Sequence, residues 1–285
     1  MRFERLLGVR RPGAALLSTI VDQGQSGARP PHSKEALTLR HTSMRIATTI
    51  ILLPLLLLAF SARRPATVES LPPVILWAWE RPENLTFLDP QKTGVAFLAT
   101  TITLREGKTV VKPRLQPLRL ARDTKLIAVV RIETDHATLS SAQLQQTAHE
   151  ISLLSGVSVV QIDFDATVSQ RDFYRELLRR VRRELSPSVG LSITALASWC
   201  AGDNWIADLP VDEAVPMLFR MGVERRQFQR RLESGQTFEA SVCRNSAGVS
   251  TDEPVTVPTI NRLYIFNPEP WTKDSFTRAM EAFPR

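Results

Sequence analysis

Short apolar runs rich in strand-forming residues recur after position 70, and they constrain the fold of this chain more than any other feature. Residues 126–130 (Leu-Ile-Ala-Val-Val) are apolar at every position. A run that is apolar on both faces is typical of a parallel strand covered by helices, because a half-exposed antiparallel strand alternates apolar and polar residues. Eight such runs are predicted as strands: 74–80, 94–104, 126–134, 157–166, 190–200, 212–221, 238–243 and 262–267.

Helical patterns separate these strands, and residues 169–185 give the clearest one. Ser169 and Asp172 have the spacing of a capping box at its start. The arginines occupy the outer face, and one apolar stripe recurs every four residues: Phe173, Leu177, Val181 and Leu185. Further helices are expected at 141–154, 224–232 and 272–283.

Eight strands with helices between them, in about 220 residues, predict a small and somewhat irregular (β/α)8 barrel of the TIM type. An open, doubly wound α/β sheet is the alternative. Some helices must be short or missing, because residues 82–91 hold at most one turn and residues 105–120 resemble a hairpin excursion around 105–108. We expect residues 62–285 to form this single domain.

Residues 44–61 read as a secretory signal peptide, with a basic start, an apolar run and small residues at its end. The apolar run is about 15 residues long, short of the roughly 20 that span a bilayer, although an uncleaved signal anchor is an alternative. Residues 1–43 are interpreted as an upstream extension from a misassigned start or as a disordered basic arm. The expected location is therefore periplasmic or secreted, or anchored in the inner membrane through this segment.

The net charge of +7 does not indicate a nucleic-acid partner, because the excess is local. Residues 1–61 hold eight Lys or Arg against three acids, which leaves 28 bases and 26 acids for the rest of the chain. A nucleic-acid-binding domain would carry a basic stripe on its folded surface.

Two cysteines, Cys200 and Cys243, follow the signal segment. In an oxidising compartment they are expected to form a disulfide, with two buried thiols as the alternative. Closing this loop would stabilise the fold by roughly 4 kcal/mol in the chain-entropy model. We expect no metal and no cofactor, because His136 and His149 lack ligand spacing with the cysteines.

The fourth run ends in two acids, Asp163 and Asp165, which share one face of a strand with Gln161. The carboxyl ends of barrel strands are where TIM barrels keep their chemistry. Two carboxylates about 6–7 Å apart repel by on the order of 2 kcal/mol at an effective dielectric of 20, which raises their pKa values. Asp165 is therefore predicted as a proton donor and Asp163 as its orienter.

Other strand ends carry aromatic and charged residues, a combination typical of sugar sites, since rings stack on sugar C–H faces while acids act on the glycosidic oxygen. Two acids on one strand cannot straddle a scissile bond, so Glu253 is the first candidate for a separate nucleophile or base, unless the substrate supplies its own. The expected substrate-binding residues are Trp77, Trp79, Glu80, Gln161, Trp199, Arg220 and Asp252. The alternative is that the tryptophans plug the barrel and the acids pair with arginines.

Gln161, Asp163 and Asp165 resemble the fourth strand of chitinase-like glycoside hydrolases, which ends in Asp-x-Asp-x-Glu with the Glu as acid. Here Asp165 stands at the acid position and Gln161 at the first Asp. The sixth run resembles that family's Met-x-Tyr strand, but Phe219 lacks the hydroxyl that would hold an acetamide.

A larger part of the chain resembles the uncharacterised bacterial domain-of-unknown-function family 3142. The segments that carry this resemblance are residues 77–81, 161–165, 198–200, 212–217, 250–254 and 264–268. The resemblance implies an exported, barrel-like domain related to glycosidases. The expected function is thus that of a glycoside-hydrolase-like protein acting on an envelope or extracellular glycan, with a non-catalytic protein that binds a glycan or a partner as the alternative.

Overall fold

The computed structural model describes residues 68–135, 138–222, 225–253 and 255–284. The chain divides into two units, Met1–Phe60 and Ser61–Arg285, and the described residues all belong to the second. The expected signal segment 44–61, the preceding residues 1–43 and His136 lie outside the described residues. Among the residues that are described, no helix has the length and apolar character needed to cross a bilayer.

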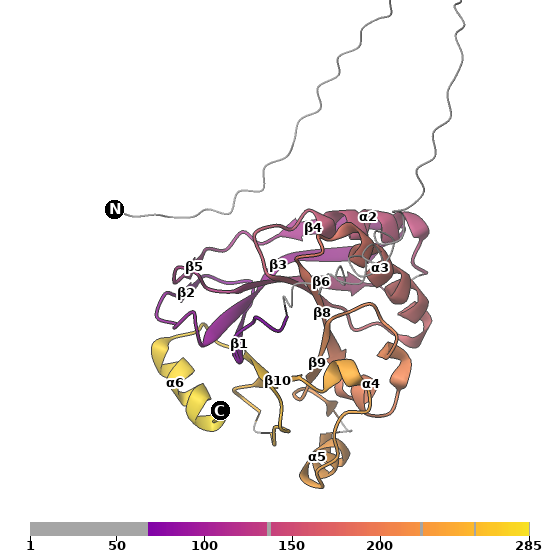
Figure 1. Cartoon of the computed structure of the whole chain (residues 1–285). Coiled ribbons are helices and arrows are strands. Elements are labelled where there is room, and N and C mark those ends of the chain that lie inside the picture. The colour runs from indigo at the N-terminus through magenta and orange to yellow at the C-terminus, as the bar shows by residue number, and fades with distance from the viewer. Residues whose placement is uncertain (1–67, 136–137, 223–224, 254, 285) are drawn as a thin grey trace, which may run out of the picture. The chain divides into compact units, whose positions relative to one another are not determined.

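Eight parallel strands form a closed barrel, which confirms the predicted (β/α)8 fold and excludes the open sheet (Figure 1). The barrel closes because β1 pairs with both β3 and β11. In the order of their pairing, the strands are β1 (Val74–Ala78), β3 (Thr93–Arg105), β6 (Leu126–Thr134), β7 (Val159–Asp163), β8 (Gly190–Leu196), β9 (Glu213–Met217), β10 (Ser246–Ser250) and β11 (Arg262–Phe266).

Helices follow most of the strands on the outside of the barrel. They are α2 (Ser141–Ser152), α3 (Arg171–Glu184), α4 (Ala197–Ala201), α5 (Arg225–Glu233) and α6 (Lys273–Ala282), with 3-10 turns η1 (Val168–Gln170), η2 (Asn204–Ile206) and η4 (Ser241–Cys243). The connections from β1 to β3, from β3 to β6 and from β10 to β11 have no helix among their described residues. The expected irregularity of the repeat is therefore present.

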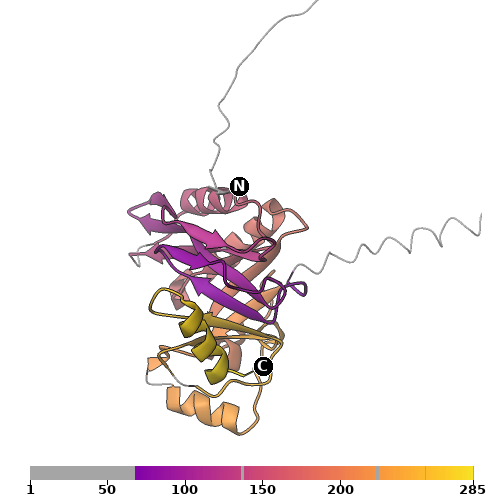
Figure 2. The same cartoon turned by 90° about the vertical axis from the view of Figure 1, so that its left-hand side faces the viewer.

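The predicted hairpin excursion is also present. β3 continues beyond the barrel and pairs antiparallel with β4 (Lys108–Pro113), with Glu106 and Gly107 at positive φ in the turn. The short strands β2 (Glu83–Leu85) and β5 (Leu118–Leu120) form a separate parallel pair. Figure 2 shows this side of the molecule from outside, with α6 beside the strands.

The prediction of the seventh strand at 238–243 was wrong. That segment holds the turn η4, and the seventh strand is β10, three residues further on. β10 reads Ser-Ala-Gly-Val-Ser, a composition that strand propensity does not favour. Its glycine is needed because a Cβ at Gly248 would lie 2.7 Å from the Trp77 ring, so the strand and the indole approach too closely for a side chain.

The start of α3 also differs from the prediction. Gln170, not Asp172, reaches back to the entering chain, and its Oε1 accepts from the N–H of Thr167 at 3.0 Å. Asp172 instead pairs with Arg175 on the helix surface. The predicted apolar stripe is buried at Leu177, Val181 and Leu185, while Phe173 is only partly buried.

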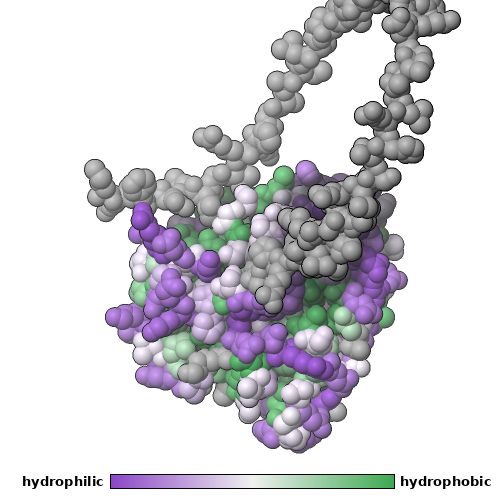
Figure 3. Space-filling model, viewed as in Figure 1, coloured by the Kyte–Doolittle hydropathy of each residue, from purple (hydrophilic) through white to green (hydrophobic). Residues whose placement is uncertain are grey.

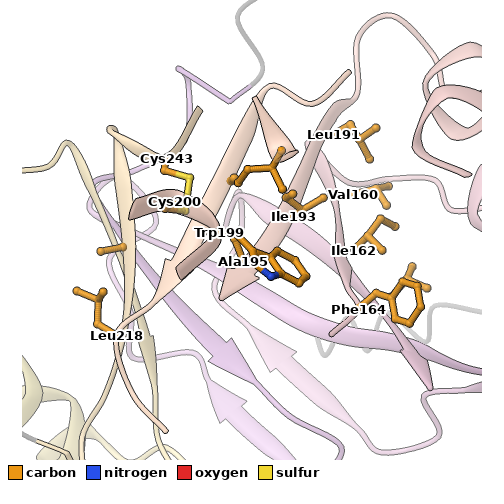
Figure 4. Packing of buried hydrophobic residues seen from close by; sticks show 14 of the residues in the cluster. Val160, Ile162, Phe164, Leu191, Ile193, Ala195, Trp199, Cys200, Leu218 and Cys243 are labelled. Carbon is orange, nitrogen blue, oxygen red and sulfur yellow. A yellow bond between two sulfur atoms is a disulfide. The ribbon is translucent and has the colours of Figure 1, made fainter. Parts of the chain in front are cut away.

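The strands separate two apolar cores because their side chains alternate between faces. Ile162 of β7 points outward into the layer beneath the helices (Figure 4). The same layer contains Phe164, which follows β7, and Ile193 of β8. The disulfide Cys200–Cys243 lies in this outer layer and joins α4 to η4, with both cysteines fully buried, which confirms the expected pairing.

A polar network centred on the buried Glu213 fills part of the barrel interior. Its carboxylate accepts from the Arg262 guanidinium at 2.6 Å and from the Tyr264 hydroxyl at 2.6 Å. The hydroxyls of Ser192 and Ser246 donate to it as well. Satisfying a buried carboxylate in this way avoids the cost of an unpaired buried charge.

Candidate active site at the carboxyl ends of the barrel strands

Asp163 and Asp165, here called the acid pair, lie at the carboxyl end of β7 on the inward face of the barrel. Gln161 and Val159, two and four residues before Asp163, contribute to the barrel interior. The Thr194 hydroxyl of the adjacent strand β8 donates to Asp163 Oδ1 at 2.8 Å. Asp163 is half-buried and Asp165 is exposed. The predicted inward orientation is therefore observed for Asp163, while Asp165 lies two residues beyond the end of β7. The charges of both acids also raise the pKa of the buried Tyr174 on α3, so the pair lies close to that helix.

The environment raises the pKa of both carboxyl groups of the acid pair. For Asp163, burial raises the pKa most, the Thr194 hydrogen bond lowers it, and the charge of Asp165 raises it again. For Asp165, burial also raises the pKa, while Arg131 lowers it. A carboxyl group with a raised pKa keeps its proton up to a higher pH, which is a property of acids that donate protons in catalysis.

The acid pair has no ion-pair partner within 4.0 Å among the residues that the structure describes. Arg131 is the paired neighbour of Asp163 in the register of β6 and β7, but its Nε contacts Glu133 at 3.2 Å. The charge of Glu133 further raises the pKa of Asp163. The two carboxylates are therefore left to interact with each other and with whatever enters the barrel mouth, the region at the carboxyl ends of the eight strands.

An aromatic group, defined as Trp79, Phe219 and Phe266, lies at the same mouth. Phe219 and Phe266 stack with ring centroids 5.8 Å apart, and Trp79 meets Phe266 edge-on at 6.2 Å. Trp79 and Phe266 are partly exposed. The Arg131 guanidinium lies 5.6 Å from the centre of the Trp79 ring, and Arg131 is also the register partner of Asp163. The aromatic group therefore lies beside the acid pair.

Trp77 and Gln161 are brought together, but below the mouth. Trp77 is 3% exposed, and its Nε1 donates to Gln161 Oε1 at 3.0 Å. Gln161 is fully buried and donates in turn to the Ser192 hydroxyl at 3.1 Å. These two predicted binding residues therefore lie in the barrel interior below the mouth, where they contact other side chains of the interior.

Asp252 and Glu253, here called the arginine-bound acids, follow β10 and are engaged with cations. Glu253 accepts from the backbone N–H of Arg220 at 3.0 Å and contacts Arg225 Nη1 at 3.3 Å. Asp252 lies 3.4 Å from Arg220 Nη2, and the Ser250 hydroxyl donates to it. That hydrogen bond lowers the pKa of Asp252 most, with a contribution from Arg220.

Two other predicted residues lie apart from the acid pair. Glu80 forms an ion pair with Lys112 of β4 at 2.9 Å. Trp199 is 3% exposed in the outer layer on α4, where it meets Trp205 edge-on at 5.0 Å (Figure 4). The run 190–200 was read as one strand, but β8 ends at Leu196 and a helical turn carries Trp199 out of the barrel.

Thr194 and Phe266 belong to the mouth but were not selected from the sequence. A signal for Thr194 is present, since Ser192 and Thr194 alternate with apolar residues in the fifth run and so share the inward face. For Phe266 no chemical signal stands out, because it reads as an ordinary apolar strand residue. Its contact with Trp79 depends on the pairing of β1 with β11, the first and last barrel strands.

The chemistry available at the mouth is that of carboxyl groups, hydroxyls and aromatic rings. Within the described ranges, no group of three or more His, Cys, Asp or Glu side chains is arranged to hold a metal ion. On the face seen in Figure 3, hydrophilic and hydrophobic residues are interspersed. The arrangement can bind a ligand that has both hydroxyls and flat C–H surfaces, and it can hold a proton beside that ligand.

Comparison with known proteins gives no relative to assist the assignment: no family model matches the chain, and no similar curated protein or solved structure was found.

Proposed function

We propose that this chain is an exported glycoside-hydrolase-like protein that acts on an envelope or extracellular glycan by acid catalysis. Asp165 donates the proton to the leaving oxygen, because it is the exposed member of the acid pair and has a raised pKa. Asp163 assists by keeping a second carboxyl group beside it. The single observation that carries the proposal is this inward-facing pair without an ion-pair partner among the described residues, next to the aromatic group.

The sugar rings stack on the exposed surfaces of Trp79 and Phe266, and the Thr194 hydroxyl holds Asp163 in place. A second carboxylate for the other side of the glycosidic bond is not free in this arrangement, since Glu253 and Asp252 are engaged with Arg220 and Arg225. The nucleophile is then water or a group of the substrate itself, as an acetamido group is in some families. The resemblance to chitinase-like enzymes stays a prediction.

Export remains part of the proposal, through the segment 44–61. The buried disulfide supports it, because structural disulfides persist in oxidising compartments. Sequencing the N-terminus of the protein recovered from the periplasm and from the medium tests cleavage. An N-terminus near residue 62 supports a signal peptide, and an intact chain in the membrane fraction supports an anchor.

The catalytic role is tested with residues 62–285 in a screen of defined cell-wall and exopolysaccharide fragments, with release of reducing ends as the readout. A responsive glycan is then offered to Asp165→Asn, which should lose turnover while its melting temperature stays close to that of the parent protein. Full activity of the folded Asp165→Asn protein would remove the assignment.

The second candidate is a non-catalytic glycan-binding protein that uses the same mouth. One observation favours it: the other acids discussed at the mouth are paired with Lys112, Arg131, Arg220 or Arg225, so none of these four is free to act as a catalytic carboxylate on the far side of the bond. Isothermal titration calorimetry beside the hydrolysis screen separates the two candidates, since affinity without product supports the binder.

A further inference from the structure

A hollow of about 450 Å³ lies between the N-terminal ends of α2 and α3, outside the barrel wall. Both helices begin at the carboxyl ends of the strands that precede them, so the hollow lies at the same end of the barrel as the acid pair. Gln170 forms part of its wall, and Gln170 Nε2 donates to the Thr134 hydroxyl at the end of β6 at 2.9 Å. The hollow therefore adjoins the rim of the mouth, and we call it the rim hollow.

The lining of the rim hollow is amphipathic. The partly buried side chains of Phe173 and Leu144 supply an apolar surface, and Ser141 and Ser169 supply exposed hydroxyls. Glu176 and Asp172 add carboxylates, of which Glu176 lies 3.5 Å from Arg183 Nη2 and Asp172 lies 2.7 Å from Arg175 Nη1, and each oxygen can accept further hydrogen bonds. The volume lies in the range of small-ligand sites, and carboxylates beside an apolar ring suit a ligand with hydroxyls and C–H faces better than they suit an anion.

The rim hollow is also close to the acid pair along the chain. Ser169 follows Asp165 by four residues, so their Cα atoms are at most about 14 Å apart. Of the residues between them, Ala166 is buried, while Thr167 and Val168 are exposed, Val168 at 75%. A chain of sugar units that leaves the mouth over this segment enters the hollow.

We infer that the rim hollow is an outer subsite for a glycan chain, so that the substrate is an oligosaccharide or polysaccharide and not a single sugar or disaccharide. This inference rests on the proposed function. Units nearest the scissile bond contact the acid pair and the aromatic group, while a unit further along stacks on Phe173 and donates hydroxyls to Glu176. Binding energy from this remote unit adds to the affinity for long ligands alone.

The test is calorimetry with β-1,4-linked N-acetylglucosamine oligomers and glucose oligomers of two to six units, titrated into residues 62–285 carrying Asp165→Asn so that no turnover occurs. Phe173→Leu, added to this background, keeps apolar packing but removes the flat ring. Phe276→Leu is the matched control, because Phe276 is a partly buried phenylalanine on the outer helix α6. Glu176→Gln is a second variant that leaves the core untouched.

The expected result is an affinity that rises with oligomer length in the parent and in Phe276→Leu. In Phe173→Leu the longest oligomers should lose about tenfold in affinity while the shortest binding oligomer is unchanged, and Glu176→Gln should show a smaller loss of the same kind. Equal length dependence in all four proteins would overturn the subsite but leave the proposed function standing. Failure of every oligomer to bind the parent would overturn both.

Discussion

The mouth of the barrel carries two sets of neighbouring acids, and their surroundings are opposite. The acid pair at the end of β7 has no ion-pair partner among the described residues, and burial raises the pKa of both groups. The arginine-bound acids after β10 contact Arg220 and Arg225, and the pKa of Asp252 is lowered. At the same end of the barrel, the fold thus favours the protonated form of the acid pair and the ionised form of Asp252.

This difference shows why position at a strand end does not by itself assign a catalytic role. Glu253 was the first candidate for a nucleophile, yet both of its oxygens face arginine groups, and it accepts from the backbone N–H of Arg220. Arg220 has a φ of 55°, a left-handed conformation that is costly for a residue with a side chain. Glu253 therefore holds the chain after β9 in place, and the proposed function assigns the chemistry to the acid pair instead.

The largest expected effect is on turnover, and it separates the two sets directly. Asp165→Asn should lower the rate on a responsive glycan by about 10²–10⁴-fold, the usual contribution of a general acid. Asp252→Asn, an equally conservative change at the same mouth, should change the rate by less than about tenfold. Steady-state kinetics on the two purified variants measure both numbers. Comparable losses in the two would erase the functional distinction.

The next effect is on stability, and it falls on the other set. Glu253→Ala should destabilise the domain by about 1–3 kcal/mol, because it removes the acceptor of the Arg220 backbone N–H and the carboxylate that contacts Arg225. Asp165→Ala should cost less, since the Asp165 side chain has no hydrogen bond or ion pair among the described residues. Urea unfolding of both variants provides the comparison, and a larger loss in Asp165→Ala would contradict it.

The barrel was predicted well because most of its strands are formed by segments that are themselves apolar and rich in strand-forming residues. The apolar runs at 94–104 and 126–134 became β3 and β6 with little change in their bounds. The exception was β10, whose small residues are required by partners distant in the sequence: Ser246 binds Glu213, and Gly248 admits the ring of Trp77. A local pattern cannot express such a requirement.

The candidate site was predicted in part for the same reason. Period-two spacing was enough to orient Asp163, which is the last residue of β7. It could not place Trp199, whose position depends on where β8 gives way to the turn α4. Nor could it reveal that Asp252 and Glu253 would meet Arg220, because the contact joins the ends of two strands about 30 residues apart.

Asp163→Asn and Asp252→Asn should change stability in opposite directions at neutral pH. A raised pKa means that the folded protein binds more protons than the unfolded chain between the ordinary and the raised value, so this stability is present at low pH and lost as pH rises. Removing the Asp163 charge should therefore raise the melting temperature at pH 7, and the gain should vanish in acid, where the folded protein already holds the proton.

For Asp252 the sign is reversed, because its pKa is lowered in the folded protein. Its contribution is present above the ordinary carboxylate pKa and is lost as pH falls. Asp252→Asn should then lower the melting temperature slightly at pH 7, and the difference from the parent should shrink in acid. Melting curves of both variants from pH 4 to pH 8 test the pair, and parallel curves with one sign would contradict the assignment.

The smallest expected effect concerns the Thr194 hydroxyl, which donates a hydrogen bond to Asp163. The Thr194 hydrogen bond lowers the pKa of Asp163 against the effects of burial, Asp165 and Glu133, while Arg131 acts in the same direction as Thr194. Thr194→Val keeps the shape of the side chain and removes the donor, so the pKa of Asp163 should rise further and the acid limb of the pH–rate profile should move.

Carboxyl ¹³C titration by NMR measures this pKa without a substrate, and Thr194→Ser, which keeps the hydroxyl, should restore the parent value. The arginine-bound acids provide the internal reference, because Thr194 is not among their contacts and Asp252 should titrate as in the parent protein. An unchanged Asp163 titration in Thr194→Val would mean that the hydroxyl only fills space, and that burial and the charge of Asp165 alone set the state of the acid pair.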